Sequence, residues 1–400
     1  MPRNAQLDQR DPSSIIAPML RYFQPLSYRI PYILLLFAIP VTFIAWQLFS
    51  KSQVLAILAA LTMLLFGLMD GVLLAALPRL HLSYGSLGLS WFLILCARII
   101  LLLIVTLPLA GLYRLLPALN TLQTTRGGLI LWAIVNAAIS AIAFYGMYLE
   151  PFDLGVTELK LTGPEFFSDR PLRIVQLADL HVERLTKRER DILTRLNTLQ
   201  PDLIVLTGDY VNYDYARDPR AIQEARMFLS QLHAPHGVYA IPGSKFVDQP
   251  ETMTQIFSGL DITVLTDQAQ ALPVGNGVLY LAGVKIDRSG HDRAVLSQLM
   301  QQSPPGAYSL LLYHTPDLIE TAAQNGVDLY LAGHTHGGQV RIPFIGAVIT
   351  LSAYGRKYAS GLHTLGPTTL YTSRGLGMEG LHLPRARLLC PPEMVVVDIC

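Results

Sequence analysis

The chain has 400 residues, a formal net charge of +1 at pH 7 and only 15% charged residues. A mean hydropathy of +0.38 is too high for a wholly soluble protein of this length. The near-neutral charge, without a basic block, gives no nucleic-acid-binding signature. Because the apolar excess lies almost wholly before residue 150, the sequence predicts a membrane part followed by a soluble part.

Residues 1–27 are polar and mildly basic, and we expect them to form a flexible tail. Residues 28–150 contain four apolar runs, each long enough to cross a hydrocarbon core that takes about 20 helical residues. These runs are Ile30–Phe49, Val54–Leu77, Trp91–Leu116 and Gly128–Leu149. Four such runs with short connections argue against a buried soluble helix pair. We therefore predict an integral membrane protein with four transmembrane helices, which has the lipid bilayer as a partner.

Two ionisable residues interrupt these runs. Asp70 lies seven residues before the end of the second run and Arg98 seven after the start of the third, so an antiparallel helix pair holds them at matching depth. An isolated charge in a bilayer is costly, which favours an ion pair between them. The alternative is an ion or proton path, for which Asp70, Arg98 and Asn136 offer few polar groups.

The charges near the membrane give an indication of sidedness. With four crossings, the tail, the middle loop and the C-terminal part share one side. That side carries Arg3, Arg10, Arg21, Arg29 and Arg79, and the other carries Lys51, Arg114 and Arg126. The positive-inside rule therefore favours a cytoplasmic C-terminal part of a plasma-membrane protein.

After Glu150 the chain alternates between short apolar runs and amphipathic stretches, the pattern of an α/β sheet. Strands are predicted at Val156–Leu161, Leu172–Leu177, Leu203–Leu206 and Ser309–Tyr313, with a helix at Lys187–Leu199. Five strand ends carry polar side chains: Asp179 and His181; Asp209; Ser244 and Lys245; His314; and His334 and His336. Each alone has the ordinary explanation of a loop or cap residue. Together, carboxylates and imidazoles suit Mn, Fe or Zn better than Ca or Mg.

This ordered series resembles the motifs of the calcineurin-like metallophosphoesterases, in particular their membrane-attached bacterial branch, over residues 156–400. The segments that carry the resemblance are Asp179-Leu180-His181, Gly208-Asp209, Pro242-Gly243-Ser244-Lys245, His314 and Gly333-His334-Thr335-His336. The resemblance implies that residues 151–400 form a four-layer α/β sandwich, with two mixed β-sheets flanked by helices. It also implies a two-metal centre. Asp179, His181 and His336 would hold the first metal, Asp209 would bridge, and His314 and His334 would hold the second.

The chain departs from the family pattern at one place, where Ser244-Lys245 replaces the usual Asn-His. Ser244 offers only a weak neutral hydroxyl, so the second metal keeps three protein ligands and should bind more loosely. Lys245 is the candidate catalytic residue: its charge could repel the second cation, replace part of it beside a phosphate, or act as an acid if poorly solvated. Arg374, in a later turn, could contact a phosphate or cap the turn.

Two functions remain open at this point. The first is a membrane-anchored phosphoesterase that hydrolyses a phosphodiester or phosphomonoester of a lipid, nucleotide or envelope precursor. Its nucleophile would be a metal-activated hydroxide, since two cations about 3.5–4 Å apart can align one with phosphorus. The second is a non-catalytic metal- or phosphate-binding sensor or scaffold, suggested by Ser244-Lys245. The number of tightly held metals distinguishes them.

Overall fold

The computed structural model describes residues 30–49, 51–76, 87–115, 126–167, 171–287, 289–380 and 385–400. The tail predicted for residues 1–27 lies outside these ranges. Contacts between residues divide the chain into two compact units. One unit contains the helices before Glu150, and the other contains residues 150–379 and 386–400.

The helical unit is built from apolar helices. These are α2 (Ile30–Leu48), α3 (Gln53–Ala76), α4 (Leu87–Leu115) and α5 (Arg126–Phe144), and a π-helical turn, Tyr145–Leu149, continues α5. Three stretches are long and apolar enough to cross a membrane: Gln53–Ala76, Ser90–Pro108 and Arg126–Phe152. Helix α2 is 19 residues long with Pro40 in its interior, and its role as a fourth span stays a prediction. The structure thus supports three of the four predicted spans.

The outer surface of these helices is apolar. Val54, Leu65 and Val72 of α3 and Ile104 of α4 are largely exposed, which suits a lipid environment better than water. This surface and the length of the helices indicate membrane association.

The predicted ion pair between Asp70 and Arg98 is confirmed. Arg98 Nη2 lies 2.5 Å from Asp70 Oδ2, and both side chains are buried. Ser140 Oγ donates to the other oxygen of Asp70 at 2.7 Å, while Arg98 also donates to Asn136 Oδ1 at 3.1 Å. Because the polar groups of three helices satisfy one another, the arrangement favours structural pairing over an ion path.

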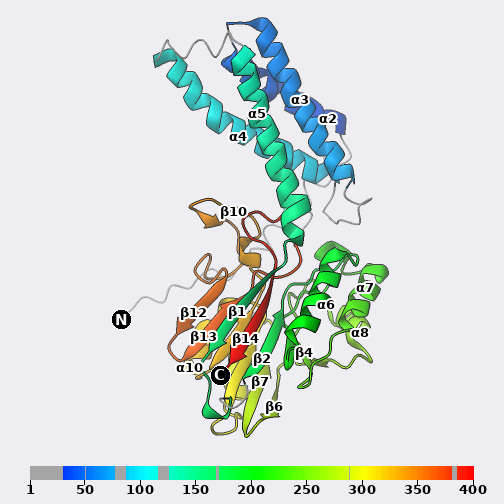
Figure 1. Cartoon of the computed structure of the whole chain (residues 1–400), viewed down its shortest axis with the longest axis vertical. Coiled ribbons are helices and arrows are strands. Elements are labelled where there is room, and N and C mark those ends of the chain that lie inside the picture. Colours follow the sequence, from blue (N-terminus) through cyan, green and yellow to red (C-terminus); the bar gives the residue numbers. More distant parts are fainter. Residues whose placement is uncertain are drawn as a thin grey trace. The chain divides into compact units, whose positions relative to one another are not determined.

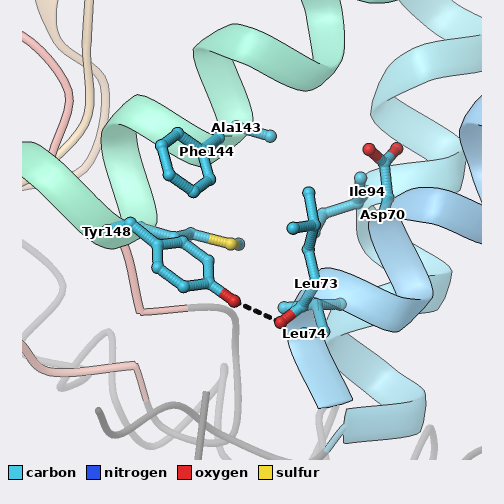
Figure 2. A pocket seen from close by; sticks show the side chains of 8 residues that line it. Asp70, Leu73, Leu74, Ile94, Ala143, Phe144 and Tyr148 are labelled. Carbon is cyan, nitrogen blue, oxygen red and sulfur yellow. Dashed lines mark hydrogen bonds between the residues drawn. The ribbon is translucent and has the colours of Figure 1, made fainter. Parts of the chain in front are cut away.

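A small pocket adjoins this cluster within the helical unit. Figure 2 shows the Asp70 carboxylate beside it and the Tyr148 hydroxyl donating to the carbonyl of Leu73. The Phe144 and Tyr148 rings stack with centroids 4.7 Å apart. Apolar side chains, among them Leu74 and Ile94, form most of the remaining wall.

The second unit contains two mixed six-stranded sheets. The first has the order β1 (Gly155–Leu161), β14 (Glu393–Ile399), β2 (Leu172–Leu177), β3 (Leu203–Leu206), β4 (Val238–Ala240), β5 (Thr263–Val264). The second has the order β12 (Gly361–Leu365), β13 (Thr368–Thr372), β9 (Leu329–Ala332), β8 (Tyr308–Leu312), β7 (Gly277–Gly283), β6 (Gln268–Val274). Strands β2, β3 and β4 run parallel, as do β7, β8, β9 and β13, so their carboxyl ends meet at one edge of each sheet.

The sheets pack against each other and carry helices on their outer faces (Figure 1). Alternating side chains of β2 separate two cores: Ile174 faces the core between the sheets, whereas Val175 packs toward the helices. Helices α6 (Lys187–Leu199), α7 (Pro219–Leu229) and α8 (Pro250–Phe257) cover the first sheet. Helices α9 (His291–Met300) and α10 (Ile319–Gln324) cover the second. This is the predicted four-layer sandwich of two mixed sheets flanked by helices.

Candidate metal centre

The predicted site residues come together where the strands of both sheets end. Asp179 and His181 follow β2, Asp209 follows β3 and Ser244 follows β4, while His314 follows β8 and both His334 and His336 follow β9. The two sheets are joined there directly, because the His334 N–H donates to both carboxylate oxygens of Asp179 at 3.0 Å.

The six aspartate and histidine residues form two groups of potential metal ligands. Asp179, His181 and His336 make one group, and Asp209, His314 and His334 make the other. Within each group, one ligand atom from every residue lies within 4.8 Å of the others. The structure therefore groups the residues as the resemblance implies.

The spacing of the ring nitrogens fits a cation. His181 Nε2 and His336 Nε2 lie 3.0 Å apart, and His314 Nε2 and His334 Nδ1 lie 3.2 Å apart. Two nitrogens each about 2.0–2.1 Å from one metal are separated by roughly 3 Å. The His336 ring is buried, with no hydrogen-bond partner for its Nδ1 among the described residues. Donor types and spacing together fit a divalent transition metal in each group.

Asp209 lies between the two groups. Its Oδ2 is 3.2 Å from His314 Nε2 and 3.7 Å from His181 Nε2. Gly243 makes room for it, because a Cβ at that glycine would lie 2.3 Å from Asp209 Oδ1. One carboxylate oxygen thus faces both groups, the position expected of a bridging ligand.

Neighbouring groups fix which ring nitrogens face the site. His314 Nδ1 lies 2.6 Å from the Thr207 carbonyl, so this nitrogen carries a proton and Nε2 faces Asp209. His181 Nδ1 lies 3.3 Å from Glu379 Oε2, near enough for an ion pair but outside hydrogen-bond geometry, and its Nε2 faces His336. Both rings are therefore oriented with Nε2 as the potential ligand.

The backbone at the site is unusual. Among the described residues, eleven non-glycine residues have positive φ, and five are potential ligands: Asp179, His181, Asp209, His334 and His336. The left-handed region is unfavourable for side chains other than glycine, asparagine and aspartate. Such strain is found where surrounding structure holds residues for function.

The charges at the site are coupled. Burial raises the pKa of Asp179 to about 6. Burial acts in the same way on Asp209, but the His314 charge outweighs it and holds the Asp209 pKa well below its usual range. Conversely, burial lowers the pKa of His314, but the Asp209 carboxylate raises it more, to about 9. Burial and the neighbouring His181 hold the pKa of His336 well below its usual value.

Ser244 and Lys245 behave differently from each other. The Ser244 N–H donates to Asp209 Oδ1 at 2.6 Å, and its hydroxyl lies 3.3 Å from His314 Nε2, beside the second group. The Lys245 side chain is exposed, and its ammonium lies 5.0 Å from the centroid of the Phe246 ring. An acid role for Lys245 requires a poorly solvated ammonium group. The exposed side chain does not meet this requirement.

Sequence analysis did not identify three buried or half-buried residues that support the site. Asp248 accepts from the N–H groups of Asp209 at 2.7 Å and Gly243 at 2.8 Å, and thereby joins two site loops. Glu379 orients His181 as described above. Arg387 is buried and donates to the carbonyls of residues 374, 375 and 377 in the turn that packs under Asp179. No local motif marks these residues, because each acts on a distant part of the chain.

Arg374 holds a turn, and its contact with a phosphate stays a prediction. Its Nη2 lies 2.9 Å from Glu393 Oε2, and its N–H donates to Glu393 Oε1 at 2.7 Å. These contacts hold the turn between β13 and β14.

The fold and the two groups of potential ligands suit a metal-dependent phosphoesterase, and known proteins of that class are similar to this chain. Residues 172–338 match the calcineurin-like phosphoesterase family. The chain is 32% identical to the uncharacterized metallophosphoesterase YkuE of Bacillus subtilis, over 67% of this chain and 93% of that protein. It is 32% identical to the phosphodiesterase YaeI of Escherichia coli, over 64% and 92%. Identity to the UDP-2,3-diacylglucosamine pyrophosphatase LpxG of Chlamydia trachomatis is 26%, over 62% and 90%.

The chain belongs to the calcineurin-like metallophosphoesterases, a family of hydrolases that use divalent metals and act on phosphoester bonds.

Proposed function

We propose that the protein is a membrane-anchored phosphoesterase with two divalent cations, Mn, Fe or Zn, bound at the strand ends. Asp179, His181 and His336 hold the first cation. His314 and His334 hold the second, and Asp209 contacts both. The observation that carries this proposal is the place of Asp209 Oδ2, within 3.7 Å of an imidazole nitrogen from each group.

The residues of the chain have separate tasks in this reaction. When bound, the two cations supply an activated water and neutralise charge on the phosphoryl oxygens. Glu379 and the Thr207 carbonyl hold the His181 and His314 rings in place. Ser244 offers a neutral hydroxyl to the second group, which therefore binds its cation more weakly than the first. We keep exposed Lys245 as the candidate to meet the negative charge of the substrate.

The substrate in this proposal is a phosphodiester or a pyrophosphate of a lipid or nucleotide-linked envelope precursor. Support comes from two relatives, which are named a phosphodiesterase and a UDP-2,3-diacylglucosamine pyrophosphatase. A phosphomonoester is the alternative to be tested alongside.

The membrane anchor is proposed to consist of residues 28–150 with four helices, and the catalytic domain of residues 151–400. Support comes from the two contact units and from the apolar surface of the helices. A fragment of residues 151–400 should be soluble and melt cooperatively. Aggregation of this fragment from every start site tried near residue 151 would argue against the boundary.

The test of the function is hydrolysis by the purified full chain. With Mn, Fe or Zn, it should cleave an activated aryl phosphodiester and should contain two metals per chain by elemental analysis. Activity should be lost on chelation and return with metal. A chain that holds metal but hydrolyses neither diester, pyrophosphate nor monoester would instead be the sensor or scaffold.

A further inference from the structure

The segment from Val340 to Ile349, called here the apolar hairpin, leaves a large apolar surface uncovered. Strands β10 (Arg341–Ile342) and β11 (Gly346–Ala347) pair in antiparallel fashion, and Figure 1 shows the hairpin projecting from the rest of its unit. At the tip, Phe344 is fully exposed and Ile345 is 57% exposed. Other exposed apolar side chains of the hairpin are Val340, Ile342, Val348 and Ile349. A contiguous surface of this kind marks an interaction site.

The base of the hairpin contacts a segment that binds Glu150. Among the described residues, Glu150 lies near the end of the last long apolar stretch. Val340 pairs with Leu388, and the Arg341 N–H donates to the Leu388 carbonyl at 2.9 Å. The next residue, half-exposed Leu389, donates its N–H to the Glu150 carboxylate at 3.0 Å, and so does Cys390. Glu150 is buried and lies within the apolar stretch 126–152, the last that is long enough to cross a membrane. The base of the hairpin is therefore linked, through contacts within its own unit, to the residue near which the apolar stretch ends.

Cations lie behind the apolar tip. The Arg356 guanidinium donates to the Ile345 carbonyl at 3.0 Å, and both Arg356 and Lys357 are exposed. An apolar edge backed by cations is the pattern of elements that lie in the interface of a membrane with anionic lipids.

The base of the hairpin packs on the metal centre. Arg341 Nε donates to the Gly337 carbonyl at 2.8 Å, next to His336. Gly338 approaches β11 so closely that a Cβ there would lie 2.4 Å from Ala347 Cβ. A molecule bound at the hairpin is therefore close to the metal centre.

We propose that the apolar hairpin inserts its tip into the lipid surface at the end of the last apolar helix, so that the enzyme takes a phosphoester carried on a lipid. This inference rests on the proposed function for its membrane anchor and its hydrolytic site. It narrows the substrate to one whose phosphate lies in the headgroup layer.

A fluorescent probe at the tip tests the insertion independently of activity. The full chain carries Ile345→Cys labelled with nitrobenzoxadiazole, in a background of Cys96→Ser and Cys400→Ser, since Cys390 is buried. The matched control is Met227→Cys on α7, where the native side chain is 50% exposed. Both proteins are reconstituted into vesicles of phosphatidylethanolamine and phosphatidylglycerol containing doxyl-labelled lipid.

Emission from position 345 should be blue-shifted and quenched by the doxyl lipid, whereas position 227 should report water. Water-like emission from position 345 would overturn the proposal. A blue shift without quenching would also overturn it, because a protein surface, such as a second copy of the chain, would then cover the hairpin.

A pair of substrates tests the consequence for catalysis. The p-nitrophenyl ester of phosphatidic acid in vesicles and soluble ethyl p-nitrophenyl phosphate share a leaving group. In the Phe344→Ser, Ile345→Ser double variant, hydrolysis of the lipid ester should fall by about tenfold or more, because two apolar anchors are lost. Hydrolysis of the soluble ester should stay within about twofold. Equal rates for variant and parent on both esters would contradict the lipid-substrate inference. If the parent hydrolyses neither ester, the proposed function fails, and the quenching result still decides the insertion.

Discussion

The pH dependence of metal binding should differ between the two ligand groups, because His314 holds a proton that a cation must displace. In the metal-free protein burial lowers the pKa of His314, but the Asp209 carboxylate raises it more, to about 9. At pH 7.5 the proton is therefore favoured by about 30-fold, or about 2 kcal/mol. The affinity of the group containing Asp209, His314 and His334 should rise by about tenfold per pH unit and level off near pH 9.

The other group provides the control within the same molecule. Burial sets the pKa of Asp179 at about 6, and burial with His181 lowers that of His336 well below its usual value, so above pH 7 neither holds a proton. Its affinity should change little between pH 7 and pH 9. Calorimetric titration of the metal-free full chain with Mn, in buffers of different ionisation enthalpy, measures both steps. The weaker step should release about one proton at pH 7.5. Equal pH dependence of the two steps, or no proton release in the weaker, would refute this reasoning.

The same proton has a consequence for stability without metal. A histidine whose pKa is raised on folding contributes stability that is complete below its unfolded value, 6.5, and is lost as the pH rises through 9. Burial and the Asp209 charge raise the pKa of Asp248 to about 7, which acts in the same direction. The chelated protein should therefore melt at a lower temperature at pH 9 than at pH 6.5. The loss from His314 amounts to about 3 kcal/mol at most.

Three sets of substitutions test other parts of the structure. Asp209→Ala should remove metal from both groups, and unchanged metal content by elemental analysis would show that it is not the bridging ligand. Asp70→Asn or Arg98→Met alone should each destabilise the full chain in detergent by about 3 kcal/mol, and both together by less than the sum; strictly additive losses would count against the ion pair. Ser244→Asn with Lys245→His should tighten the second metal and raise hydrolysis of esters with poor leaving groups by up to about 100- to 10,000-fold. A loss of existing activity in this double variant would instead give Lys245 a role of its own.

The sequence alone predicts the elements whose residue pattern ends at a turn or cap that local chemistry specifies. Strands β2 and β3, which are apolar runs, and the amphipathic helix α6, which begins after the capping residue Thr186, all have the predicted bounds. The strand-end positions of the ligands follow from the apolar pattern, whereas their division into two groups was predicted from the family resemblance. Their role as metal ligands stays a prediction that elemental analysis can test.

The remainder depends on long-range contacts. Strand β14, at the end of the chain, lies between β1 and β2, and no local pattern predicts this pairing. Asp248 and Arg387 support the site through hydrogen bonds to backbone groups of other loops, so residue spacing gives no sign of them.

The left-handed backbone at five potential ligands links the amount of this protein to metal supply. Asp179 and Asp209 tolerate this conformation, whereas the three histidines each cost on the order of 1 kcal/mol, together a substantial part of the stability of a typical domain. Cations bound to the folded loops would offset this penalty, since ligands that bind only the native state stabilise it. In a cell short of transition metal, more molecules would carry opened loops and reach the proteases. The abundance of the protein should then follow the metal content of the growth medium even at constant synthesis.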